Sequence, residues 1–205
     1  MGIDLTGELR GFRISRENFN EGTDGSVEYG CVLKGNHRVL RFDMITRNIG
    51  DEDLVIGDPR DPAVQTKFFK PFDERFTEGL GYVFKANPFF EYSLTNYDAS
   101  INVSGYKYAF CFDALESESC YDQGIAAGGE KEDTYGSTMA CQFIVIDNLP
   151  DGEYTLGATV NAPSVNAIKA GEGDVFIEED NYDNNTVAVR IQIKGDEVTK
   201  LPDTY

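Results

Sequence analysis

Hydrophobic and polar residues alternate with a period of two along most of this chain. The alternation is clearest in two segments, where one face carries Tyr154, Leu156, Ala158 and Val160 in the first and Val187, Val189, Ile191 and Ile193 in the second. Successive side chains of a β-strand point to opposite faces of its sheet. The pattern therefore predicts two strands, each with one buried face and one solvent face.

Shorter alternating or apolar runs predict further strands. They span residues 5–14, 27–33, 38–47, 54–56, 89–97, 106–112 and 142–146. Many short strands separated by Gly, Asn, Asp and Pro are typical of an antiparallel β-sandwich. No long window has the residue spacing of an amphipathic helix. We expect an all-β fold, an antiparallel sandwich with little helix, and a single domain over residues 1–205.

Three stretches depart from this alternation. Residues 57–87 combine prolines, aromatic residues and mixed charges, and residues 124–134 are polar and rich in glycine. Both compositions favour turns and loops, so we expect long irregular connections there. The C-terminal tail, residues 194–205, is charged, and we expect it to be mobile.

The charge of the chain excludes some classes of partner. It has 36 acidic and 18 basic residues, and a formal net charge of −18. Such a surface repels nucleic-acid phosphates and anionic lipids, so we expect neither as a partner. It suits divalent cations or cationic partners instead. No apolar stretch is long enough for a membrane span, and the first residues show no basic and apolar segments typical of a signal peptide.

Histidine and cysteine restrict the chemistry further. The chain has one histidine, His37, which cannot by itself form a histidine-rich copper or zinc site. A Ser-His-Asp triad would have to use His37, and no motif around it supports one. The four cysteines, Cys31, Cys111, Cys120 and Cys141, include no CxxC pair. Scattered cysteines in even number favour disulfides in an oxidising compartment.

Six segments, taken in order, resemble the catalytic domain of the lysyl oxidases, the copper-dependent protein-lysine oxidases. They read HRVLRF with RNIG, DLVIGDP, GYKYAFC, DTYGSTMACQFI, NLPDGEYTL and EDNYDNN. Each motif is weak alone, but the six occur in the family's order and extend over most of the chain. The resemblance implies a β-sandwich, in agreement with the alternation, and an extracellular location.

The resemblance also implies a copper ion and a quinone cofactor. The family holds copper with an H-x-H-x-H run, and the matching positions here are Lys85, Asn87 and Phe89. None of these side chains is a normal copper ligand. The quinone forms from a lysine and a tyrosine, which match Lys107 and Tyr135. We therefore expect no copper, no catalytic residues, and Lys107 and Tyr135 as vestigial quinone positions.

A calcium site is a further implication of the resemblance. The matching positions are Asp4, the carbonyl of Leu5, Glu179, Asn181, Asn184 and Asn185. Calcium prefers carboxylate, amide and carbonyl oxygens, which this set provides. Asn181 stands where the family has an aspartate, so binding would be weaker. The alternative is a polar turn that caps two strand ends.

Cysteines and sequons give the remaining expectations. The resemblance pairs Cys111 with Cys120, whereas Cys31 and Cys141 lack their family partners; they either pair with each other or bond to another chain. Asn102-Val-Ser and Asn184-Asn-Thr are N-glycosylation patterns.

Three hypotheses on function follow. The first is a non-catalytic extracellular structural or interaction module with a structural calcium site, whose partners are itself, in a filament or matrix, or other extracellular proteins. The second is a copper- and quinone-dependent amine oxidase acting on peptidyl lysine or primary amines. The third is a calcium-dependent binding module.

Overall fold

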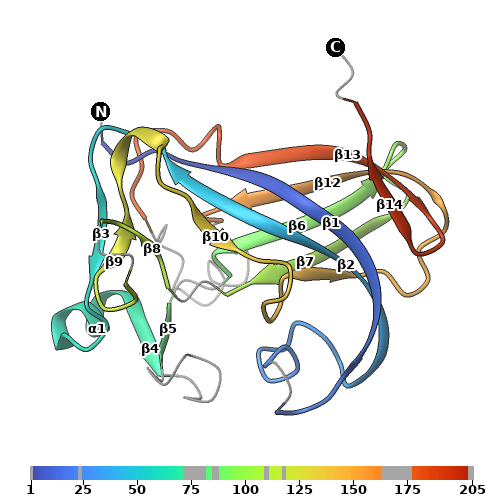
Figure 1. The fold of residues 1–205 in the computed structure, drawn as a ribbon, viewed down its shortest axis with the longest axis horizontal. Helices are drawn as coiled ribbons and strands as arrows, with labels where there is room; N and C mark the ends of the chain where they lie inside the picture. Colours follow the sequence, from blue (N-terminus) through green and yellow to red (C-terminus); the bar gives the residue numbers. More distant parts are fainter. Residues whose placement is uncertain are drawn as a thin grey trace.

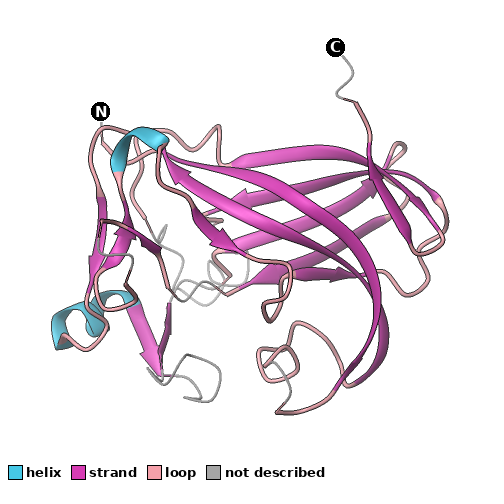
Figure 2. Ribbon diagram, viewed as in Figure 1, coloured by secondary structure: helices cyan, strands magenta, loops and turns pink. Residues whose placement is uncertain are grey.

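Strands form about half of the residues that the structure describes, and those residues also contain two short helical segments (Figure 2). The computed structural model describes residues 2–22, 25–71, 82–84, 88–108, 111–116, 119–162 and 177–202. Two antiparallel sheets lie face to face, and the long strand β1 crosses over β12, β13 and β14 of the opposite sheet (Figure 1). The expected all-β fold is confirmed.

The first sheet is built around β2. Its strands are β1 (Leu5–Phe19), β2 (Gly35–Asn48), β10 (Asp133–Tyr135) and β11 (Phe143–Val145), all paired antiparallel. β1 lies along one edge of β2, and β10 and β11 lie along the other. The alternation in β2 turns Leu40, Phe42 and Met44 toward the opposite sheet, where all three are completely buried.

The second sheet has five antiparallel strands. Their order is β14 (Glu197–Lys200), β13 (Thr186–Lys194), β12 (Gly152–Val160), β6 (Phe90–Asn96) and β7 (Asn102–Lys107). The alternating residues of β12 that the sequence singles out, from Tyr154 to Val160, are buried. Between the sheets the rings of Phe42 and Tyr92 meet edge to face, with centroids 4.8 Å apart. One hydrophobic core therefore joins the two sheets.

Smaller elements lie at one end of the sandwich. They are β3 (Leu54–Gly57), α1 (Pro62–Phe68), β4 (Phe69–Pro71), β5 (Tyr82–Phe84), β8 (Asp113–Ala114), β9 (Gln123–Ile125) and the 3₁₀ turn Ala127–Gly129. The pair β8–β9 is parallel. Helix α1 begins where the Asp61 carboxylate accepts the Ala63 N–H and Pro62 occupies the first turn, both common N-terminal signals. No helix in the described ranges has the length and hydrophobicity to cross a bilayer.

Two of the predicted strands differ from the structure: one is absent, and the other lies a few residues earlier in the chain. Residues 27–33 form turns, because Gly25 and Gly30 adopt positive φ and the Tyr29 N–H folds back to the Gly25 carbonyl. The strand predicted at 106–112 is β7, which starts at Asn102 and ends at Lys107, where its pairing with β6 stops.

The loop and tail predictions are wrong in part. Residues 124–134 include the end of β9 and the start of β10, and residues 57–87 include α1 and short strands. In the tail, Gly195 at φ +57° turns the chain into the hairpin β13–β14. Cross-strand hydrogen bonds between β13 and β14 therefore order most of the tail, which was expected to be mobile because it is charged. Residues 72–81, 85–87 and 203–205 of these predicted segments lie outside the described residues.

Candidate functional site

The fold brings Lys107 and Tyr135 together from opposite sheets. Lys107 ends β7 and Tyr135 ends β10, and the Lys107 Nζ lies 5.4 Å from the centre of the Tyr135 ring. Only 9% of Lys107 and 5% of Tyr135 are exposed. An ammonium within about 6 Å of a ring centroid is attracted by the negative face of the ring. The two positions matched from the sequence are therefore neighbours in the interior.

Backbone carbonyls are among the partners of this pair. Lys107 Nζ donates to the Ala140 carbonyl at 2.8 Å, and the Tyr135 hydroxyl donates to the Cys111 carbonyl at 3.1 Å. The ring of Phe90, the strand partner of Lys107, meets the Tyr135 ring at 5.0 Å. The amine is thus held by aromatic and carbonyl groups.

Aromatic side chains occupy the neighbourhood expected to hold copper. Phe89 is completely buried, with its ring 4.8 Å from that of Phe90 and 5.0 Å from that of Phe112. Lys85 and Asn87 lie outside the described residues. A phenyl ring donates no electron pair to copper, and the described residues contain no cluster of three His, Cys, Asp or Glu suited to a metal. The donor set therefore does not fit copper.

A buried acid that the sequence analysis missed lies on the same strand face as Tyr135. The Asp133 Oδ1 accepts the Asp113 N–H at 3.2 Å, and the side chain is almost fully buried. Burial, with the nearby negative charge of Asp113, raises the pKa of Asp133 well above its usual value. Asp133 could have been found from the sequence, because residues two apart in a strand lie on the same face of the sheet.

Residues 136–142 cover the pair and are anchored by Arg41. Its buried guanidinium donates to the carbonyls of Ser137 at 2.9 Å and Met139 at 3.2 Å. It also forms a bidentate pair with Glu17, at 2.7 and 2.6 Å, and this pairing lowers the pKa of Glu17. The sequence gave no sign of this role, because Arg41 sits in a strand whose partners come from distant segments.

Two disulfides join segments of the chain. Cys111 and Cys120 are bonded, with Cα atoms 5.2 Å apart. Cys31 and Cys141 are bonded as well, with Cα atoms 5.5 Å apart, so of the two alternatives the structure has the intrachain pair. This second disulfide fastens residues 136–142 to the segment between β1 and β2.

A second polar centre joins the start of β1 to the turn before β13. The Glu179 carboxylate is 8% exposed. It accepts the Leu5 N–H at 2.6 Å and amide N–H groups from Asn161 at 2.5 Å and Asn185 at 2.8 Å. Burial raises the pKa of Glu179, with Asp4 a smaller contributor in the same direction. The sequence analysis missed Asn161.

The remaining positions of the expected calcium set differ in what their side chains or backbone groups contact. Asn184 Nδ2 donates to Asp4 Oδ1 at 2.8 Å. The side-chain oxygens of Asn184 and Asn185 are buried and have no hydrogen-bond partner among the residues the structure describes. Asn181 instead accepts the Asp183 N–H at 3.0 Å, as in an Asx turn. At Leu5 the N–H has a role that sequence reasoning did not foresee.

An acidic pocket of about 420 Å³ adjoins the same centre. Its lining residues are Gly2, Asp4, Ile49, Gly50, Asp51, Asp180 and Asn181. Asp4 and Asn181 therefore belong both to the expected calcium set and to the pocket wall.

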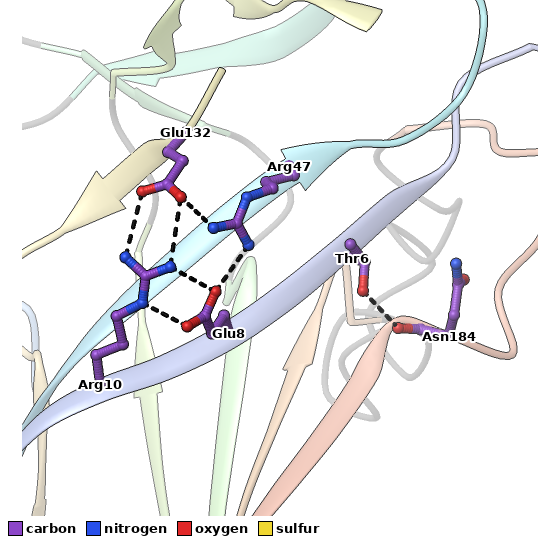
Figure 3. Close-up of polar contacts among 6 residues, drawn as sticks. All are labelled: Thr6, Glu8, Arg10, Arg47, Glu132 and Asn184. Carbon is purple, nitrogen blue, oxygen red and sulfur yellow. Dashed lines mark hydrogen bonds and ion pairs between the residues drawn. The ribbon is translucent and has the colours of Figure 1, made fainter. Parts of the chain in front are cut away.

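Charged residues on the outside of the β1–β2 ribbon form a ladder next to this centre. Arg10 and Arg47 bridge Glu8 on β1 and Glu132 before β10, and the Arg47 Nη1 lies 2.9 Å from Glu8 (Figure 3). Thr6, also in Figure 3, contacts the Asn184 carbonyl through its hydroxyl at 3.4 Å. Arg10 is the largest cause that lowers the pKa of Glu8 to about 2.

The two glycosylation patterns differ in accessibility. Asn102 is exposed at the start of β7, the last strand of its sheet. Asn184 is half-buried, and its amide nitrogen is engaged by Asp4. A glycan on Asn184 would break that contact.

Comparison with known proteins gives one family. The family model described as lysyl oxidase matches residues 26–201. Protein-lysine 6-oxidase of Homo sapiens is 28% identical in an alignment 174 residues long that covers 78% of this chain and 35% of the human protein. The Sus scrofa and Rattus norvegicus proteins of the same name are each 27% identical over 78% of this chain, and over 59% and 36% of their own length. The chain thus matches about a third to three fifths of the length of these relatives. Because the family model covers most of its residues, the chain belongs to the lysyl oxidase family.

Proposed function

We propose that this domain is a non-catalytic extracellular module, a lysyl oxidase sandwich stabilised by calcium and specialised for structural contacts. The observation that carries the proposal is the contrast between its two inherited centres. At the first, Phe89 packs on Phe90, whose ring contacts Tyr135. At the second, the buried Glu179 carboxylate is bound by N–H groups, and the side-chain oxygens of Asn184 and Asn185 are buried without a partner among the described residues. Two disulfides support an oxidising location.

The calcium part of the proposal rests on the donor chemistry around Glu179. A buried carboxylate with a raised pKa gains from a nearby cation, which stabilises its charged form. The buried oxygens of Asn184 and Asn185 also gain a partner if a cation lies between them and Asp4. Calcium would tie the first strand to the hairpin β13–β14, and so close the sandwich at this end.

Thermal unfolding with and without calcium tests this proposal. At a calcium concentration about 100 times the dissociation constant, binding stabilises the folded state by about 2.7 kcal/mol. For a chain of this size, that raises Tm by roughly 5–10 °C. Glu179→Gln should abolish the calcium-dependent shift.

The matched control is Glu178→Gln, which makes the same change in charge at the exposed neighbouring position and should keep the shift. An unchanged shift in Glu179→Gln, or no shift in the unaltered chain at millimolar calcium, would remove calcium from the proposal.

The second candidate is an amine oxidase, which the placement of Lys107 beside the Tyr135 ring favours. It predicts a covalent Lys107–Tyr135 peptide in a protease digest of protein expressed with copper, and a quinone absorbance. Separate unmodified peptides from that preparation would eliminate it and support the non-catalytic proposal.

Self-assembly into a filament or matrix predicts a mass that increases with protein concentration in light scattering; a constant monomer mass excludes it.

A further inference from the structure

The single imidazole of the chain lies between two hydrogen-bond acceptors. His37 Nδ1 is 2.7 Å from Asp147 Oδ2, and Nε2 is 3.0 Å from the Leu33 carbonyl oxygen. Neither a carboxylate nor a carbonyl can donate a hydrogen. A neutral imidazole has one N–H, and an imidazolium has two. Both contacts are therefore satisfied only when the ring is protonated.

The two acceptors differ in how firmly they are held. Asp147 Oδ1 accepts the Arg38 N–H at 2.6 Å, so the carboxylate is fixed whether or not the ring is protonated. Although burial alone raises the pKa of Asp147, the Arg38 N–H and His37 together lower it, so the carboxylate stays ionised near neutral pH. A neutral ring keeps its N–H toward Asp147. The lone pair on Nε2 then faces the oxygen of Leu33, and that contact is lost.

Other charged groups near the ring are already paired. They are Glu17 and Arg16 on β1, Arg38 on β2 and Asp196 in the β13–β14 turn, besides Asp147 itself. Glu17, the strand partner of His37, is bound by Arg41. Among the described residues, Asp147 is the one charged group hydrogen-bonded to the ring.

We propose that His37 is a proton-dependent latch between the turn after β11 and the segment that precedes β2. Protonated His37 bridges Asp147 and Leu33, and loss of the proton releases the Leu33 carbonyl. The proposal rests on the two acceptors that face the ring, and pH is the variable that tests it.

The rest of the segment limits how far it can open. Cys31 is bonded to Cys141, and Val32 packs with Phe19, Val39 and Phe143. The released part therefore lies between Val32 and Gly35, and includes the Leu33 side chain, which is 81% exposed. Opening of the latch therefore loosens only the short segment between Val32 and Gly35, while the two sheets keep their structure.

Nuclear magnetic resonance of the full chain tests the latch, because one histidine gives one unambiguous set of ring signals. At pH 5.5 both ring nitrogens should carry protons, and at pH 8 only Nδ1. Amide exchange of residues 33–35, corrected for its intrinsic pH dependence, should be at least about tenfold faster at pH 8, as expected for loss of a charged hydrogen bond. Amides in the β12–β13 ladder serve as the internal control.

His37→Gln, which is neutral at every pH, should remove the pH dependence of exchange in residues 33–35. Wild-type pH dependence in this variant would overturn the proposal. A single protonated ring nitrogen at pH 5.5, or equal protection of residues 33–35 at the two pH values, would also overturn it, and these two measurements need no variant.

Discussion

The Lys107–Tyr135 pair and the Glu179 centre are both buried, polar and assembled from distant segments, but they are completed differently. The first is completed by aromatic rings and by the carbonyls of Ala140 and Cys111. The second contains a buried carboxylate and amide oxygens without partners among the described residues. The difference teaches that two buried polar centres in one sandwich can differ in how their polar atoms are partnered.

Aromatic packing is the main feature of the first region. Phe89 contacts the rings of Phe90 and Phe112, and Phe90 contacts Tyr135. Such contacts stabilise the core but provide no donor atoms. In the second region two amide oxygens, of Asn184 and Asn185, are buried without a partner among the described residues, and a cation would give them one.

The largest expected effect comes from removing an aromatic ring of the first region. Phe89→Ala should lower the free energy of unfolding by about 3–5 kcal/mol, because it leaves a cavity in a dense core. Tyr97→Ala, at the fully exposed end of β6, should change it by less than about 0.5 kcal/mol. Urea denaturation measures both, and a small effect at Phe89 would show that the aromatic cluster packs loosely.

A smaller effect is expected at the second region. Asn185→Ala removes donors to Glu179 and to the Val160 carbonyl. In the absence of calcium it should lower the free energy of unfolding by about 1–3 kcal/mol, since the buried acceptors lose partners. Thermal unfolding in a chelator measures this, and wild-type stability would mean that water replaces the amide.

The hydroxyl of Tyr135 should matter less than its ring. Tyr135→Phe removes the hydrogen bond to the Cys111 carbonyl and keeps the contact with Phe90. We expect a loss of about 1 kcal/mol in urea denaturation. A loss as large as that of Phe89→Ala would indicate that the hydroxyl organises more of the interior than this bond.

The smallest effect is expected from the surface ladder. The pKa of Glu8 is lowered to about 2, chiefly by Arg10. Its contribution to stability is therefore present above about pH 4.5 and is lost as the pH falls toward 2. Because Glu8 is more than a third exposed, that contribution should stay below about 1 kcal/mol. Unfolding of Glu8→Gln across pH 2–6 measures it, and an unchanged pH profile would show full screening.

Alternation predicted the strands whose two faces differ in polarity. β12 and β13 follow their predicted bounds closely, and β2 follows to within a few residues. Short strands such as β9 and β10 were missed, because three residues carry too little periodic signal. Their pairing partners, β3 and β2, come from far away in the sequence.

The site residues that the sequence indicated came from the resemblance to a family, and their functional roles stay predictions. The sequence indicated Lys107, Tyr135 and Glu179, and the structure places each of them in a buried polar setting. It gave no sign of Arg41, Asp133 or Asn161, whose roles depend on partners at least sixteen residues away. Residue type limits the contacts that a side chain can make, but the fold decides which partners lie within reach of it.

The sequence by itself determined the all-β architecture, the strong negative charge and the single imidazole, because periodicity and composition are properties of the chain alone. The tertiary structure decided the pairing of Cys31 with Cys141, the contact between Lys107 and Tyr135, and the position of His37 between two acceptors. The physical reason is that these contacts are a few ångströms long and join segments from different strands and turns. Only the packing of the two sheets brings such segments together.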